Sequence, residues 1–180
     1  MAEQGAKMVT AVQRPPLPAL RPFIKLLWAA DERKPDGLAR IDRERLLPTG
    51  SMHLVFRLNE SPIRIFESID DPKGETFRRG VIGGLRAGFY VKDISESGRT
   101  VGALLQPGAS KLLFGVGADE LAERHTGIDE VWGQDANQLW GTLGELTGKF
   151  KKCSPISALR TPKRLSPFTK RLSERRKSFA

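Results

Sequence analysis

Residues 101–133 constrain the fold more than any other segment, because the spacing of apolar residues changes twice within this short stretch. An alternating run predicts a strand over 101–106 that is buried on most of its surface. Pro107-Gly108 ends this strand, since proline has no N–H for the sheet ladder and glycine opens a corner. The expected successors are a short apolar helix through 112–114, a second helix with Asp119 and Glu120 in its first turn, and core anchors at Val131 and Trp132.

The preceding part of the chain is dominated by short apolar runs between turn residues. Strands are predicted over 52–58, 63–66, 80–82 and 89–93. Residues 17–28 have a 3–4 apolar spacing that favours a helix, and a strand through 26–30 is the alternative. Short strands followed by helices predict an α+β fold that is mainly β, a barrel or a sandwich, with short C-terminal helices.

The net charge of +9 is concentrated at one end of the chain. Of 30 basic and 21 acidic residues, residues 149–180 hold 11 and one, which leaves 19 and 20 in the rest. The body is therefore close to neutral, and its composition does not indicate a nucleic-acid surface. We expect residues 1–13 to be disordered, 14–147 to form one domain and 148–180 to be a basic disordered tail.

Cysteine and apolar content exclude several classes of protein. Cys153 is the single cysteine, so neither a disulfide framework nor a thiolate metal cluster is expected. The first residues lack the apolar core of a signal peptide, and no apolar run approaches the ~20 residues of a membrane helix. A cytoplasmic protein without membrane contact is the expectation.

The order of these motifs resembles the N-terminal sensory domain of one group of AraC-type transcription regulators. In that group a strand, a Pro-Gly corner, an apolar helix ending in glycine, an acidic-Leu helix and a Leu/Val-Trp-Gly close follow one another. The matching segments here are 106–109, 112–115, 119–121 and 129–133, and the similar upstream stretches are 14–28, 46–58 and 81–93. Gly117 and Thr49 depart from the residues common in the group. The resemblance implies a cupin-like body that holds a small effector.

The effector residues implied by such a body are few. Trp28, His53, Phe56 and Tyr90 are the candidates for an effector pocket, and the alternative is that Trp28 and Phe56 belong to the core. His53 and His125 are the only histidines, so no three-histidine metal shell is available. We therefore expect no metal, no cofactor and no catalytic residue, and a small cupin-like enzyme is the less favoured alternative.

An amphipathic helix is predicted over 135–146. Leu139, Trp140 and Leu143 share its apolar face. The resemblance implies that such a helix pairs two subunits in a homodimer, and the alternative is that this face packs on the body of the domain.

The tail determines how far the resemblance extends. Two helix-turn-helix units need more than about 40 residues, and the 32 residues after Gly148 contain Pro155, Pro162 and Pro167. We expect that the DNA reader is missing, either because the protein is truncated or frame-shifted, or because the tail is a genuine basic arm or a solvated end. As an arm it would bind DNA non-specifically through phosphate contacts. Its contact residues would be Lys163, Arg164, Lys170, Arg171, Arg175, Arg176 and Lys177.

Overall fold

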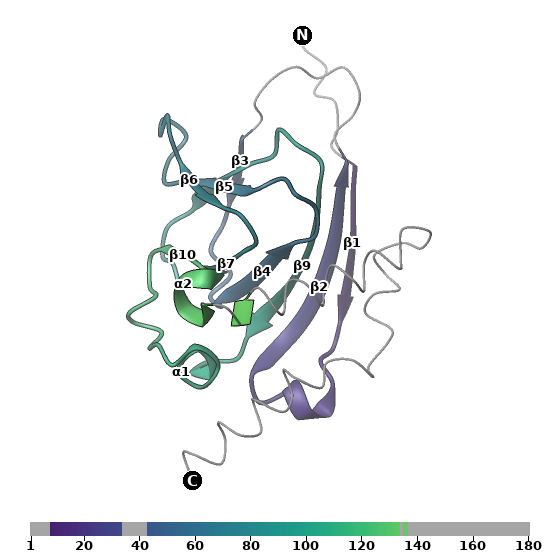
Figure 1. Ribbon diagram of the computed structural model, residues 1–180, viewed down its shortest axis with the longest axis vertical. Coiled ribbons are helices and arrows are strands. Elements are labelled where there is room, and N and C mark those ends of the chain that lie inside the picture. Colours follow the sequence, from purple (N-terminus) through teal and green to yellow (C-terminus); the bar gives the residue numbers. More distant parts are fainter. Residues whose placement is uncertain (1–7, 34–42, 134, 137–180) are drawn as a thin grey trace.

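The structure is a computed structural model that describes residues 8–33, 43–133 and 135–136. Within these residues the chain forms ten strands, one 3-10 helix and two short α-helices (Figure 1). In chain order these are β1 (Met8–Arg14), η1 (Pro18–Leu20), β2 (Ile24–Arg33), β3 (Arg43–Leu46), β4 (His53–Arg57), β5 (Ile63–Phe66), β6 (Glu75–Phe77), β7 (Gly80–Gly83), β8 (Tyr90–Asp93), β9 (Gly98–Leu105), α1 (Ala109–Phe114), β10 (His125–Gly127) and α2 (Ile128–Trp132).

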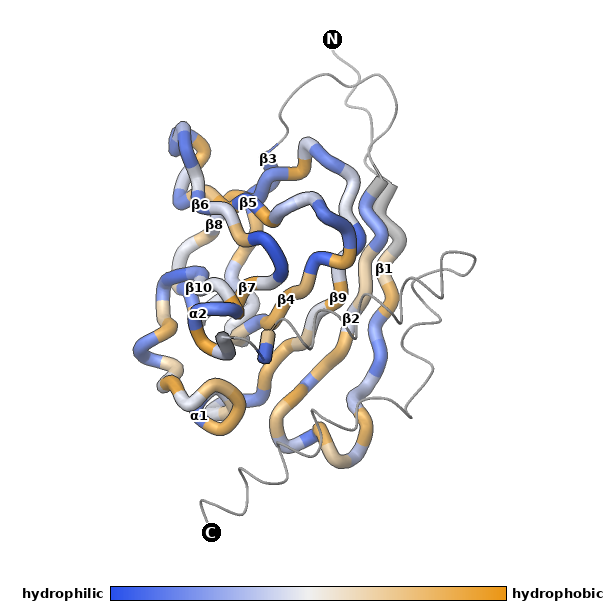
Figure 2. Tube along the Cα trace, viewed as in Figure 1, coloured by the Kyte–Doolittle hydropathy of each residue, from blue (hydrophilic) through white to orange (hydrophobic). Residues whose placement is uncertain are grey.

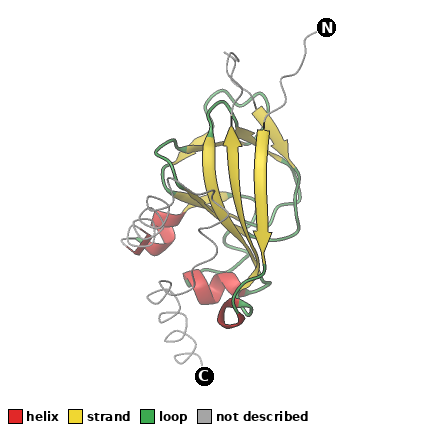
Figure 3. Cartoon of the chain, turned by 90° about the vertical axis from the view of Figure 1, so that its right-hand side faces the viewer, coloured by secondary structure: helices red, strands yellow, loops and turns green. Residues whose placement is uncertain are grey.

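The strands belong to two antiparallel sheets. Sheet A has six strands in the order β1-β2-β9-β4-β7-β10, and sheet B has four in the order β3-β8-β5-β6. Figure 3 shows the strands as one β body with the short helices at one end. The predicted class, mainly β with short helices late in the chain, is confirmed, and of the two predicted architectures, barrel or sandwich, the two sheets are those of a sandwich.

Strand β4 explains how sheet A packs on both faces. Leu54 and Phe56 are buried on one face, and His53 and Val55 alternate with them on the other. The first face joins the larger apolar cluster with Ile82 of β7 and Leu105 of β9. The second face looks toward sheet B, because Val55 packs with Ile63, Ile65 and Phe77.

The short helices cover the first face of sheet A. Leu113 and Phe114 of α1 and Ile128 of α2 are buried in the same cluster as the sheet residues. The indole of Trp132 locks the two helices together, because its Nε1 donates to the Leu113 carbonyl over 2.9 Å and its ring lies 5.4 Å from that of Phe114. In Figure 2 apolar residues run along much of β2, β4 and α1, which are the elements of this layer.

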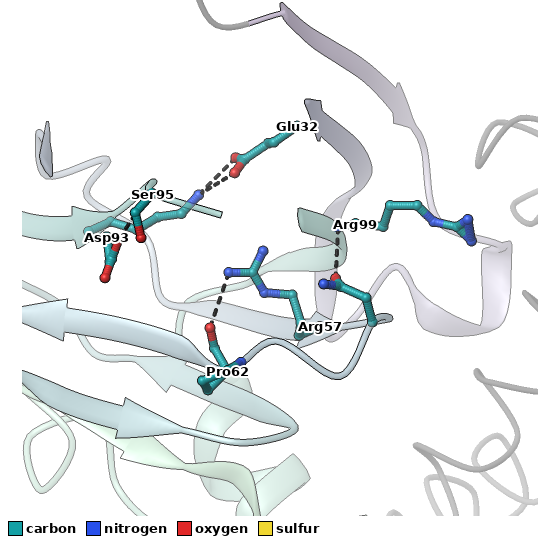
Figure 4. Close-up of polar contacts among 8 residues, drawn as sticks. Glu32, Arg57, Pro62, Asp93, Ser95 and Arg99 are labelled. Atoms are coloured by element: carbon teal, nitrogen blue, oxygen red, sulfur yellow. Dashed lines mark hydrogen bonds and ion pairs between the residues drawn. The ribbon is translucent and has the colours of Figure 1, made fainter. Parts of the chain in front are cut away.

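Charged side chains hold the two sheets together at one end of the sandwich. Lys92 of β8 donates to both carboxylate oxygens of Glu32 in β2, over 2.8 and 3.1 Å. The nearby guanidinium of Arg57 donates to the Pro62 carbonyl over 3.4 Å (Figure 4). Burial lowers the pKa of Arg57, and the charges of Glu32, Glu96 and Asp93 oppose that shift. These groups therefore form a buried ionic contact between the sheets, whereas the contact around Val55 is apolar.

Two predictions for the N-terminal part of the chain are wrong in detail. The helix expected over 17–28 is only the 3-10 turn of η1, and the alternative strand through 26–30 lies within β2, which runs from Ile24 to Arg33. The 3–4 spacing is misleading there because Leu20 and Phe23 face the larger apolar cluster from the turn. Residues 8–13, expected to be disordered, belong to β1, which pairs with β2 along its whole length.

The second short helix is also absent at the predicted place. Asp119 and Glu120 lie in a run of turns, where Glu120 Oε1 accepts from the Gly117 N–H over 3.0 Å. Here the acidic side chain accepts a hydrogen bond from a backbone N–H of a turn, as it could from an N–H at the start of a helix. The helix that does form, α2, begins later and contains Val131 and Trp132, which pack half-buried on the larger cluster.

Gly84 allows a close crossing of two chain segments, and its substitution provides a test. A Cβ at Gly84 would lie 1.6 Å from the carbonyl oxygen of Leu121, whereas a Cβ at Gly88 would meet nothing within 4 Å. We predict that Gly84→Ala lowers the free energy of unfolding by about 1–3 kcal/mol or more, because the backbone must move. Gly88→Ala should change it by less than about 0.5 kcal/mol. Urea denaturation of both variants checks this, and equal stabilities would contradict the described crossing.

Candidate functional site

The two histidines of the chain lie side by side on the face of sheet A that looks toward sheet B. His53 of β4 and His125 of β10 both pair with Gly83 of the intervening strand β7. Residues paired in this way share one face of a sheet. A Cβ at Gly83 would lie 3.6 Å from His125 Nε2 and 3.7 Å from His53 Cδ2, so both imidazoles flank the bare backbone of this glycine.

Sheet B adds an aromatic side chain to the histidine pair. The ring of Tyr90, from β8, meets that of His125 edge to face, with centroids 4.5 Å apart. Phe77 of β6 lies 6.4 Å from the same imidazole. The cluster therefore combines two strands of sheet A with two of sheet B.

Arg86 enters the cluster from the loop between β7 and β8. Its Nη1 lies 3.0 Å from His125 Nδ1, and its Nη2 donates to Glu67 Oε2 over 2.8 Å. The Arg86 side chain is only 7% exposed, whereas that of Glu67 is 70% exposed. The buried guanidinium of Arg86 is thus paired with a solvent-exposed carboxylate.

The loop that contains Arg86 is hydrogen-bonded to the turn before β10. The Gly84 N–H donates to the Arg124 carbonyl over 3.0 Å, and the Glu123 N–H donates to the Leu85 carbonyl over 2.8 Å. The Glu123 carboxylate accepts from the Ala87 N–H over 2.7 Å. Among the described residues Glu123 is the one non-glycine with a positive φ, 57°, a conformation that costs about 1 kcal/mol or more. The surrounding hydrogen bonds hold it there.

The contact with Arg86 fixes the proton of His125. A guanidinium can only donate, so Nδ1 of His125 accepts and the ring proton of the neutral imidazole is on Nε2. Burial, the charge of Arg86 and the proximity of His53 lower the pKa of His125 to about 4. Burial likewise lowers the pKa of His53 and raises that of the Tyr90 hydroxyl. All three groups are consequently uncharged at neutral pH.

Several polar atoms of the cluster keep hydrogen-bonding capacity. His53 Nε2 lies 2.8 Å from the Thr49 hydroxyl, but no partner within the described residues contacts His53 Nδ1, His125 Nε2 or the Tyr90 hydroxyl. His53 and Tyr90 are half-buried, and His125 is 8% exposed. These three atoms lack partners in that part of the chain but are not fully buried, so a bound molecule can reach them.

The structure separates the four residues predicted for a pocket. His53 and Tyr90 do belong to one cluster. Trp28 is on the same face of sheet A, but its ring packs against Gly102, where a Cβ would come within 2.3 Å of it. Phe56 belongs to the core, as the alternative stated: it alternates with Val55 and is buried with Ile82 and Ile128. Aromatic character alone could not distinguish the two faces of β4.

The sequence did not identify Gly83, Arg86 and His125 as site residues. His125 follows a turn and has no flanking pattern, and Arg86 lies in an unremarkable loop. The only available signal was that the chain has two histidines, and strand pairing is needed to bring them together.

The remaining predicted residues lie outside the described residues. These are the dimer-helix residues Leu139, Trp140 and Leu143, and the tail residues Lys163, Arg164, Lys170, Arg171, Arg175, Arg176 and Lys177. Within the described part of the chain, no group of three or more His, Cys, Asp or Glu side chains could hold a metal ion. No helix in that part combines the length and the apolar character needed to cross a membrane.

The fold and the cluster define a two-sheet antiparallel β domain with polar residues between its sheets. A family model, that of the domain of unknown function DUF6597, matches residues 12–127, and the chain belongs to this family. The match spans all of the cluster, including His53, Tyr90 and His125. No curated protein and no solved structure matches the chain.

The depressed pKa of His125 predicts a specific dependence of stability on pH. The unfolded chain binds a proton at this residue below about pH 6.5, whereas the folded chain binds it only near pH 4. The contribution of His125 is thus complete above pH 6.5 and is lost as the pH falls to 4, by about 3 kcal/mol. Urea denaturation of the wild type should show this loss, and His125→Asn should lack most of it. Parallel pH profiles of the two proteins would contradict the described environment.

Proposed function

We propose that this domain binds a small organic molecule at the cluster formed by His53, Gly83, Arg86, Tyr90 and His125. One observation carries the proposal. Three side chains from three strands, His53, Tyr90 and His125, converge between the sheets with polar atoms that no described residue pairs. These atoms are partly accessible to solvent, so a ligand that displaces water from the cluster can pair with them.

The cluster favours recognition over chemistry. A general base works best when its pKa lies near the operating pH, and the pKa of His125 is about 4. The imidazole is instead a fixed hydrogen-bond donor at Nε2, oriented by Arg86. We therefore assign ligand binding to this site and no catalytic step.

We propose further that the domain senses its ligand as the sensory domains of AraC-type regulators do. The resemblance described above supports this role, and so does the position of the cluster in the chain. His125 lies three residues before α2, and the loop of Arg86 is hydrogen-bonded to the turn that precedes β10. A ligand that shifts Arg86 or His125 would act directly on the segment leading into α2.

Gly83 offers a test that leaves the polar residues in place. A valine there would place methyl groups between the two imidazoles, whereas the Cβ of alanine would lie at ordinary contact distance, 3.6–3.7 Å. A panel of small polar organic molecules is screened by thermal unfolding, since a ligand at 100 times its Kd stabilises a protein by about 2.7 kcal/mol. We expect a compound that raises the Tm of the wild type and of Gly83→Ala, and that fails to raise the Tm of Gly83→Val.

The basal Tm and circular dichroism spectrum of Gly83→Val serve as the folding control. If hits stabilise a folded Gly83→Val as strongly as the wild type, the ligand binds elsewhere and the assignment of the site is wrong.

A further inference from the structure

The hydrogen-bonding atoms left open in the cluster are mostly donors. Because Nδ1 of His125 accepts from Arg86, its Nε2 carries a proton that no described residue accepts. The Tyr90 hydroxyl stays protonated at neutral pH, since burial raises its pKa, and it too has no partner in the described part of the chain. The Nε–H of Arg86 also lacks a hydrogen bond within the described residues but is buried from solvent, so Arg86 contributes its charge and not a direct contact.

The cluster also contains a positive charge, that of Arg86, which is only partly neutralised. The Arg86 side chain is only 7% exposed, but its partner Glu67 is mostly in water, where its field is screened. Glu44, the other carboxylate that acts on Tyr90, is exposed as well. Because Arg86 Nη1 lies 3.0 Å from His125 Nδ1, this positive charge acts directly on the imidazole and contributes to its lowered pKa. An incoming anion would therefore meet a cation that is still only partly neutralised.

The same face of sheet A continues as an apolar surface. Leu104 pairs with His53, and Val55 pairs with Gly102, which lies under Trp28. Leu104, Val55 and Trp28 are half-buried, in contrast to the fully buried residues of the opposite face. A molecule held by the donors would thus have apolar side chains beside it.

We propose that the ligand of this site is a small organic carboxylate with an apolar body. Its carboxylate would accept from Tyr90 and His125 near the charge of Arg86, and its body would lie toward Val55 and Leu104. The inference rests on the proposed function, because it specifies what that same site binds. A cation is disfavoured, since the open groups donate and the nearest charge is an arginine.

Matched probes separate the carboxylate from the rest of the ligand. Benzoate and 3-methylbutanoate are titrated into the full chain by isothermal calorimetry, each beside its own carboxamide and alcohol. We expect at least one acid to bind at least tenfold more tightly than its carboxamide. Tyr90→Phe keeps the ring against His125 and removes one hydrogen bond to a charged acceptor, so it should weaken that acid about tenfold or more. Thr76→Ala, at an exposed position of β6, serves as the matched control and should leave the affinity unchanged.

The outcomes distinguish the carboxylate inference from the proposed binding function. If a carboxamide or alcohol binds as tightly as its acid, and Gly83→Val abolishes that binding, the carboxylate inference is wrong and the proposed binding function stands. If the acid binds equally well to the wild type and to Tyr90→Phe, the assignment of its carboxylate to this cluster is overturned. If no probe binds and no compound of the wider panel stabilises the protein, both the inference and the proposed function fail.

Discussion

The packing of sheet A on both faces is the constraint on which the rest of the structure depends. One face is sealed by η1, α1, α2 and the turns between them, and its apolar cluster runs from Leu20 to Ala136. The other face receives the smaller sheet B, whose apolar contact is limited to a few residues around Ile63, Ile65 and Phe77. Burial on the first face can supply most of the hydrophobic stabilisation. The second face is consequently able to hold histidines, a tyrosine and the buried ion pair of Lys92 with Glu32.

Strand β4 makes this division visible in single residues. Leu54 and Phe56 belong to the sealed face, and His53, Val55 and Arg57 belong to the face shared with sheet B. Along that second face, His53 lies in the histidine and tyrosine cluster, Val55 in the apolar contact and Arg57 at the ionic end. A slip of one residue in the pairing of β4 would exchange the two faces. The site therefore depends on the register of the sheet as much as on the residues themselves.

The sequence predicted the local features of this arrangement better than the distant ones. The runs over 52–58, 63–66 and 101–106 contain β4, β5 and most of β9, because their alternation and their Gly or Pro boundaries are local signals. β10 has three residues and lies next to a charged turn, so nothing in its sequence indicates a strand. It forms because β7 offers an unpaired edge. His125 is brought near His53 only by the pairing of β10 with β7. The sequence alone therefore could not predict that the two histidines belong to one site.

Arg86 connects this cluster to the chain that follows it. Its loop is tied by backbone hydrogen bonds to the turn at Glu123, and that turn leads through His125 into α2. Its guanidinium also determines which nitrogen of His125 carries the proton. The most direct test of the account is therefore the nitrogen chemical shifts of the histidine side chains in 15N-labelled protein at pH 7. The account predicts a neutral His125 protonated at Nε2, and a doubly protonated imidazole or one protonated at Nδ1 would contradict it.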